Sequence, residues 1–252
     1  MDTTIRTLFE VYPPQPKATI PYGIRVNDMV YGGAINGSEP VSGRLSTDVQ
    51  EQMRVALTKV KDLVESSGGS LDNVARATGF CTTEEHRRLI DEVWMEVYPD
   101  EQDKPAFKQI LGSLPEGHLV ALECQALIGE RRQRIDIPNI SAHDPTIKIG
   151  NWLFTSRCHG NDPATGKVVE GGLEAQTVQT LDNLVTLAKL AGGSQASIVA
   201  MTMFGRSKDY MPTARRIFEE RFADPSRRPA LNQLVNFISG SFEVSIEMAA
   251  VL

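Results

Sequence analysis

The sequence lacks the features that mark membrane proteins, disulfide-rich proteins and nucleic-acid-binding proteins. No apolar run approaches the roughly 20 residues of a membrane-spanning helix, and the N-terminus lacks the basic start and apolar centre of a secretory signal. Cys81, Cys124 and Cys158 are odd in number and widely spaced, which is typical of reduced thiols. The net charge of -6 gives no electrostatic basis for binding nucleic acid or an anionic membrane. We therefore expect a cytoplasmic protein with neither kind of partner.

Histidine is equally scarce, and a metal site is not expected. None of the four histidines shows the paired spacing that holds a metal ion; they are His86, His118, His143 and His159. With 41% hydrophobic and 23% charged residues, the composition is that of an ordinary globular protein. The 252 residues allow one large domain or two small ones.

What the sequence does contain is one domain twice. Glu123 recurs as Glu247, and Pro105 recurs as Pro229, each 124 positions later. Such a long period indicates a duplicated domain and not a solenoid. We place the domains at residues 1–129, beginning with an extended Pro-rich arm, and 130–252, with a solvated basic connector at residues 131–134. Further pairs at the same offset are Gln52 and Gln176, Gly68 and Gly192, and Phe80 and Phe204.

Each copy reads as strands, helix, strand, helix, strands. In the first copy, Asp48 begins a helix with one apolar stripe, and Gly68 ends it. Thr82 or Thr83, followed by Glu84 and Glu85, is expected to cap a second helix that reaches Val97. The expected strands cover residues 28–31, 74–81, 106–110 and 119–128. Because two helices cover only one face of such a sheet, we expect an α+β fold whose other face meets another domain.

The last strand of each copy carries the glutamate on an otherwise apolar segment. Residues of a strand alternate between two faces, so Leu122 and Cys124 should pack under the helices while Glu123 points away from them. Ile246 and Glu247 divide in the same way. A buried carboxylate is costly unless it is paired or solvated, which favours a wet cleft.

The order of short motifs, found twice, resembles the RidA family. The resemblance covers about residues 20–128 and 143–252. In the family this implies a chorismate-mutase-like domain, with a six-stranded sheet backed by two helices, that assembles into trimeric barrels. The motifs in the second copy are Thr155-Ser156, Asp162-Pro163-Ala164-Thr165-Gly166, Glu174-Ala175-Gln176-Thr177, Pro229-Ala230 and Ile246-Glu247.

The same resemblance implies a hydrolase that acts on C–N bonds. Members of the family hydrolyse reactive enamines and imines to ketones and ammonia without a metal or cofactor, and a related branch deaminates 2-aminomuconate in aromatic catabolism. The substrate is a small molecule bound in clefts between domains. The glutamate of the last strand positions the attacking water, a role that would fall to Glu247 and Glu123. A tyrosine and a Ser-Gly segment line the cleft.

The residues around this glutamate depart from the family pattern. The family's carboxylate-binding arginine after Pro-Ala is replaced by Phe107 and Leu231, which do not provide a bidentate clamp. These two side chains are either core residues or an apolar cleft wall. The early tyrosine corresponds to Tyr22, with His143 at that place in the second copy.

The segment that follows offers a substitute for the missing arginine. Ser156 matches the family serine, and Arg157 follows it, so that Arg157 is a candidate for binding an anionic group. His159 can exchange protons near neutral pH if its pKa is close to the usual 6.5. The ordinary alternatives are a structural carboxylate, an inter-domain salt bridge and a hydrogen-bonded histidine.

Three functions therefore remain open. The leading one is an imine or enamine deaminase in which Glu247, and in the first copy Glu123, orients water. The second is a non-catalytic metabolite-binding or interaction module, which the missing arginines favour and the two retained glutamates oppose. The third is an endoribonuclease, which the acidic charge balance opposes.

Overall fold

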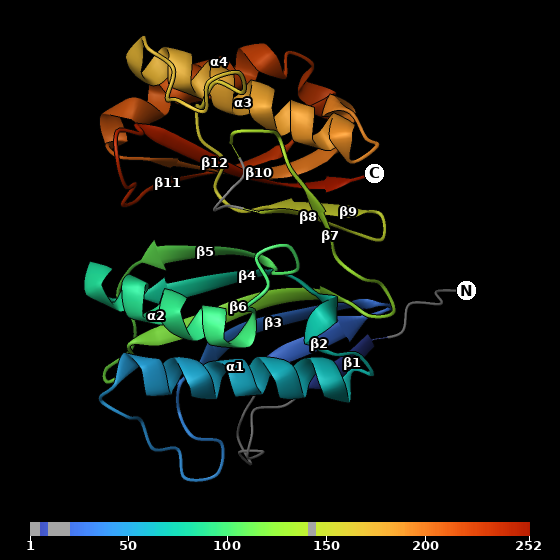
Figure 1. Cartoon of the computed structure of the whole chain (residues 1–252), viewed down its shortest axis with the longest axis vertical. Coiled ribbons are helices and arrows are strands. Elements are labelled where there is room, and N and C mark those ends of the chain that lie inside the picture. The colour runs from blue at the N-terminus through green and yellow to red at the C-terminus, as the bar shows by residue number, and fades with distance from the viewer. Residues whose placement is uncertain (1–5, 10–20, 141–144) are drawn as a thin grey trace. The chain divides into compact units, whose positions relative to one another are not determined.

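The computed structural model describes residues 6–9, 21–140 and 145–252. The chain divides into two compact units, Met1–Arg132 and Gln133–Leu252. Each unit holds a six-stranded sheet with two helices along one of its faces (Figure 1). We call the opposite face of each sheet the helix-free face.

The first unit contains eight of the described helices and strands besides one short 3-10 turn, η1 (Leu71–Asn73). They are β1 (Arg6–Phe9), β2 (Gly23–Val26), β3 (Met29–Asn36), α1 (Val49–Ser66), β4 (Val74–Cys81), α2 (Glu84–Val97), β5 (Ala106–Leu111) and β6 (Val120–Leu127).

The second unit repeats this series. It contains β7 (Gln133–Ile135), β8 (Thr146–Ile149), β9 (Trp152–Thr155), α3 (Gly172–Leu190), β10 (Ile198–Gly205), α4 (Met211–Arg221), β11 (Ala230–Val235) and β12 (Val244–Val251), with the 3-10 turns η2 (Gln195–Ser197), η3 (Lys208–Tyr210) and η4 (Pro225–Arg227).

Strand order confirms the duplication. The first sheet runs β1-β2-β3-β6-β4-β5, and the second runs β7-β8-β9-β12-β10-β11. The six corresponding strands therefore stand in the same order. In both sheets the strand that comes last in the sequence, β6 or β12, lies in the interior of the sheet. The one parallel pair of each sheet lies at its edge, β4 with β5 and β10 with β11. The strand that carries each glutamate is therefore held on both sides.

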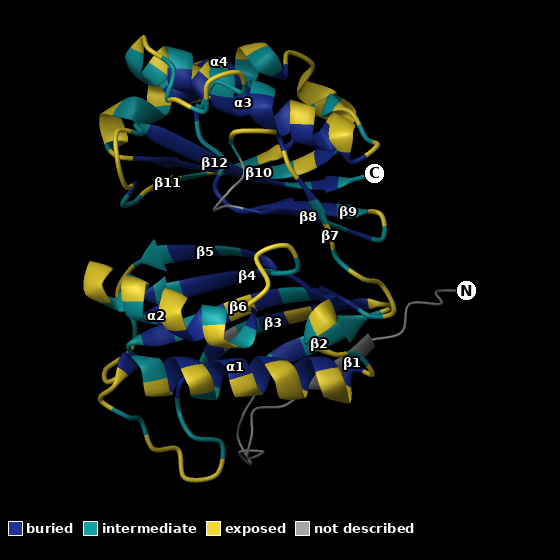
Figure 2. Ribbon diagram, in the orientation of Figure 1, coloured by how far each residue is buried: buried dark blue, intermediate teal, exposed yellow. Residues whose placement is uncertain are grey.

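The helices begin where the sequence predicts. The Asp48 carboxylate accepts hydrogen bonds from the N–H groups of Gln50 and Glu51, and the Thr83 hydroxyl accepts one from His86. Figure 2 shows the consequence of their apolar stripes, because each helix has a buried side toward its sheet and an exposed side toward solvent. Val120, Leu122 and Cys124 lie in the first core, and Val244, Ile246 and Met248 lie in the second. The predicted division of the last strand into two faces is confirmed.

The chain's connecting segments form more contacts than the sequence predicts. The expected arm includes β1, whose backbone pairs with β2 from Arg6–Val26 to Phe9–Gly23; the Pro-rich residues 13–16 lie outside the described residues. The basic connector is not solvated throughout, since the Arg132 side chain is only 2% exposed. It donates to the carbonyls of Leu71 and Val74 and pairs with Asp103 at 3.0 Å. Arg132 therefore anchors the end of the first unit.

Candidate functional site

A β-bulge precedes the candidate site in each unit. Gly32 pairs with Cys124 and Ile35 with Leu122, so three steps on β3 match two on β6. In the second unit Phe154 pairs with Ala249 and Cys158 bridges to Ile246, so four steps match three. One extra residue on the bulged strand bends it and re-aims the side chains that follow.

Glu247 lies on the helix-free face beside this bulge. It is opposite Thr202 of β10, and the next position on that face pairs Ser245 with Phe204. The Cys158–Ile246 bridge brings Arg157 to the position next to Glu247 on the neighbouring strand. Glu247 is 3% exposed. A carboxylate is thus surrounded by a hydroxyl, an aromatic ring and a guanidinium on one sheet face.

Arg157 is buried, and its side chain bonds to other parts of the second unit. Its guanidinium stacks over the Phe204 ring, with 4.1 Å from Cζ to the ring centroid. Its Nη1 donates to the carbonyl oxygen of Phe237 at 2.8 Å, and Nη2 donates to Asn236 Oδ1 at 3.3 Å. Since these donors already bond protein acceptors, the positive charge of Arg157 acts on the site mainly as a fixed electrostatic field.

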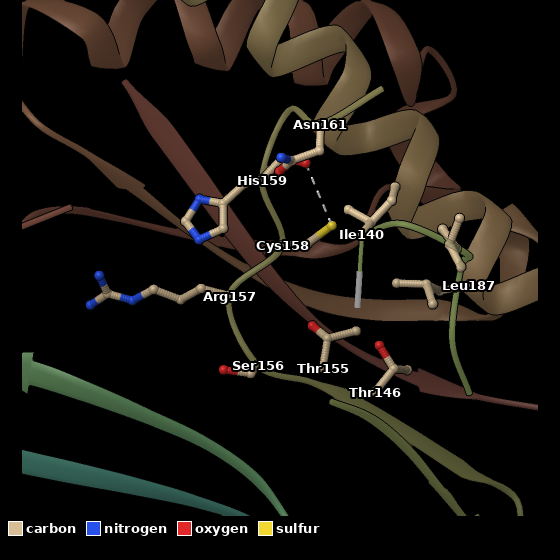
Figure 3. Close-up of a pocket in the computed structure, with 10 residues that line it drawn as sticks. Ile140, Thr146, Thr155, Ser156, Arg157, Cys158, His159, Asn161 and Leu187 are labelled. Atoms are coloured by element: carbon tan, nitrogen blue, oxygen red, sulfur yellow. Dashed lines mark hydrogen bonds between the residues drawn. The ribbon is translucent and has the colours of Figure 1, made fainter. Parts of the chain in front are cut away.

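His159 continues the same segment and points to the same side as Arg157 and Ser156 in Figure 3. Its ring stacks on Phe242 with 4.1 Å between centroids, and its carbonyl oxygen accepts from Asn183 Nδ2 at 3.0 Å. Burial, and then the charge of Arg157, lower the pKa of His159 to about 4, against a hydrogen bond to the Val244 backbone that raises it. The imidazole is consequently neutral at pH 7.

A small cavity lies on the other side of this segment, where Cys158 points (Figure 3). Its volume is about 30 Å³, which accommodates water but not a metabolite. Glu247 is not part of its lining, which consists of Ile137, Ile140, Thr146, Thr155, Ser156, Arg157, Cys158, His159, Asn161 and Leu187. The cavity thus shares Ser156, Arg157 and His159 with the candidate site but does not include the glutamate.

The first unit keeps the glutamate and the threonine opposite it, but it lacks the other polar neighbours of Glu247. Glu123 lies opposite Thr78 and is exposed. At the places of Arg157, His159 and Ser245 the first copy has Ala34, Asn36 and Ala121. Tyr22, expected to line the cleft, packs at the margin of the first core, and its carbonyl oxygen accepts the Gly33 N–H at 2.9 Å.

The two residues that replace the family arginine are core residues. Phe107 stacks on Trp94, with 4.1 Å between centroids and 10° between planes. Its register partner Ala77 also pairs with Cys124, so Phe107 lies on the helix-covered face. Leu231 packs against the second core. Both side chains thus pack against the cores, as one of the two sequence interpretations has it, and their role as a substrate-binding wall stays a prediction.

Of the three neighbours of Glu247, sequence alternation places Ser245 on the same strand face, whereas Thr202 and Phe204 were missed. The repeat held a signal for two of them, because Thr78 and Phe80 stand 124 positions before Thr202 and Phe204. His143 lies outside the described residues. Among the described residues, no cluster of three or more His, Cys, Asp and Glu side chains could hold a metal ion.

The sequence profile described as "Endoribonuclease L-PSP" matches this chain at residues 13–128 and again at 136–252. The chain belongs to this family. It is a tandem repeat of the RidA domain, as the motifs predicted. A RutC family protein of Aquifex aeolicus is 30% identical over 113 residues, which are 44% of this chain and 90% of the relative.

Two further comparisons concern this tandem RidA-family chain, one with a relative in sequence and one with a solved structure. The 2-iminobutanoate/2-iminopropanoate deaminase of Rattus norvegicus is 27% identical over 112 residues, 44% of this chain and 81% of the relative. A chorismatase crystal structure aligns with 91% of this chain and 76% of its own, with a TM-score of 0.64 and 19% identity, which shows a shared fold alone. No helix among the described residues is long and apolar enough to cross a membrane.

Proposed function

We propose that this chain is a cofactor-independent deaminase that hydrolyses the C=N bond of small imines, or of enamines after tautomerisation. Relatives of this family carry the names of imine and reactive-intermediate deaminases. The observation that carries the proposal is the placement of Glu247. It is a buried carboxylate beside a hydroxyl and a cation, on the face that the helices leave uncovered.

The proposed reaction consumes one water and releases one ammonia. Glu247 accepts a hydrogen bond from the water, takes its proton as the oxygen attacks the imine carbon, and so helps to form a carbinolamine. The first proton passes to the nitrogen and completes the neutral carbinolamine. Its hydroxyl then gives up a proton to Glu247, which passes it to the nitrogen as the C–N bond breaks, and a ketone and ammonia leave. Arg157 stabilises negative charge near the carbon by its field, while the neutral ring of His159 shapes the cleft. Ser156 and His143 remain proposed contacts of the substrate.

The substrate class is narrower than that of a general imine deaminase. Phe107 and Leu231 pack in the cores and offer no carboxylate clamp, so affinity for simple 2-imino acids should be weak. We therefore include 2-aminomuconate, an enamine from aromatic catabolism, among the proposed substrates. Binding in clefts between domains of a homotrimer is part of the same proposal.

The test compares two matched variants, Glu247→Gln and Glu123→Gln. Amino acid oxidases supply 2-iminopropanoate and 2-iminobutanoate in situ, 2-aminomuconate is supplied separately, and ammonia release is followed. Because general acid–base groups contribute about 10²–10⁴-fold, we expect Glu247→Gln to lose at least about 100-fold in kcat. Glu123→Gln should stay close to wild type, because Ala34, Asn36 and Ala121 stand where the second copy has Arg157, His159 and Ser245.

Four other outcomes would redirect the assignment. Full activity in Glu247→Gln contradicts the mechanism, and equal losses in both variants contradict the assignment to the second unit. Thermal shifts with these compounds but no ammonia release would favour the metabolite-binding alternative, for which the missing arginine is the supporting observation. RNA cleavage that survives in Glu247→Gln would contradict both the deaminase and the metabolite-binding alternative.

A further inference from the structure

In each unit the side-chain amide of a buried glutamine forms hydrogen bonds to the backbone as a neighbouring β-strand would. Gln176 of α3 accepts the Glu243 N–H at its Oε1, 2.9 Å away, and its Nε2 donates to the Ser241 carbonyl oxygen at 3.4 Å. The amide thus pairs with the N–H and C=O groups that flank Phe242. A neighbouring strand in an antiparallel ladder would pair with these groups in the same way.

Gln52 of α1 repeats this arrangement in the first unit. Its Oε1 accepts the Leu119 N–H at 2.9 Å, and its Nε2 donates to the Gly117 carbonyl at 2.8 Å. Gln52 is fully buried and Gln176 is 5% exposed. The same bonding therefore occurs at the entry to β6 and at the entry to β12.

In the second unit this amide lies behind the candidate site. The residue it brackets, Phe242, forms the stack with His159. The chain then enters β12, which carries Glu247 four positions beyond Glu243. From the same helix, Asn183 holds the His159 carbonyl. One face of α3 thus fixes both strands that supply the site.

We propose that Gln176 is a positioning residue for the candidate site, holding the turn at Ser241–Glu243 so that Phe242 packs on His159 and β12 presents Glu247 at a fixed depth. This inference rests on the proposed function for its catalytic consequence. Gln52 supports the same turn in a unit without the arginine and the histidine, so it is a structural counterpart and an internal control.

The chemistry requires an amide at this position. Glutamate has no donor for the Ser241 carbonyl and would repel it, whereas methionine matches the length but forms neither bond. Asparagine is one methylene shorter and cannot reach both partners. Gln176→Met, compared with Gln52→Met, therefore removes the pairing in one unit at a time with little change in volume.

The first experiment measures local order in both variants. Losing a buried hydrogen bond should accelerate amide hydrogen exchange at residues 241–246 by about tenfold or more in Gln176→Met, and not in Gln52→Met. In the same samples, NMR titration of the His159 ring should show a pKa that moves up from about 4 toward 6.5 only in Gln176→Met, because the ring becomes hydrated. Unchanged exchange and an unchanged titration in Gln176→Met would overturn the inference.

The second experiment links position to turnover. We expect kcat to fall about tenfold or more in Gln176→Met with KM nearly unchanged, and kcat to be retained in Gln52→Met. If Glu247→Gln abolishes turnover but Gln176→Met does not lower kcat, the positioning role is wrong and the proposed function stands. If the wild type releases no ammonia from any of the compounds, the proposed function fails, and exchange and the His159 titration alone decide whether Gln176 positions these residues.

Discussion

A histidine that is buried next to an arginine is held in its neutral form. Two effects lower the pKa of His159 to about 4, namely its removal from water and the nearby charge of Arg157. In an unfolded chain the same side chain would titrate near 6.5. Between these values the unfolded chain binds more protons than the folded one.

This difference predicts how stability depends on pH. Because the folded pKa lies below the unfolded one, the contribution of His159 is complete above about pH 6.5 and is lost as the pH falls toward about 4. At about 1.4 kcal/mol for each pH unit, the loss over this window is about 3 kcal/mol. Urea unfolding from pH 4.5 to 7.5 should show this slope in the wild type and a flatter profile in His159→Phe, which retains the stack on Phe242.

Carboxylates titrate in part of the same range, so His159→Phe must be compared with a variant of a histidine outside the site. His118→Phe serves this purpose, since His118 is partly exposed in the segment before β6 of the first unit. Parallel pH profiles for the wild type and both variants would contradict the buried neutral state of His159.

At the scale of elements, two glycines allow the strand before each long helix to approach that helix closely. A Cβ added to Gly160 would lie 2.7 Å from the Cα and carbonyl oxygen of Gln176, and one added to Gly37 would lie 2.3 Å from Gln52 Cβ. The glutamine side chains therefore reach the turns at Gly117–Leu119 and Ser241–Glu243 only because these positions have no side chain.

Alanine at either position should be costly for packing reasons. Overpacking of this kind costs about 1–3 kcal/mol, and we expect Gly160→Ala and Gly37→Ala to reduce the free energy of unfolding by at least this amount. Chemical denaturation followed by circular dichroism measures it. Gly33→Ala is the matched control, because nothing lies within 4 Å of its Cβ, and a comparable loss in that variant would refute the steric explanation.

The elements show where sequence reasoning succeeds and where it stops. The stripe of α1 and the alternation of β6 follow from periodicity, so their bounds and faces were predictable. The bulges at Gly32–Ile35 and Phe154–Cys158 depend on pairing between distant strands, which no local pattern reports. Phe107 was ambiguous for a related reason, since an apolar residue fits a cleft wall or a core equally well until Trp94 is known to face it.

Arg132 illustrates a second limit. A run of basic residues normally predicts a solvated segment, and Arg131 with its 82% exposed side chain conforms. Arg132 does not, because the carbonyls of Leu71 and Val74 and the carboxylate of Asp103 converge on its guanidinium. Only the folded chain brings these three acceptors together.

At the scale of the whole molecule, two six-stranded sheets with the same strand order follow one another in one chain. Each has two helices on one face only, and proteins bury the second face of such a sheet by assembly or by domain packing. We expect a homotrimer in solution. Light scattering coupled to size exclusion should give three times the chain mass of 27.7 kDa, and a monomer at micromolar concentration would contradict it.

Because the two domains are joined in one chain, a substitution can alter the site of one domain without altering that of the other. In an assembly of identical single domains, every substitution appears at every site at once, so a change that harms one harms all. Here the pair Gln52 and Gln176, with Gly37 and Gly160, is kept in both copies, whereas Arg157, Ser245 and His159 have Ala34, Ala121 and Asn36 as counterparts. The supporting glutamine and glycine thus occur in both copies together with the glutamate, whereas the arginine and the histidine occur only in the second, so that a substitution at one site leaves the other unchanged.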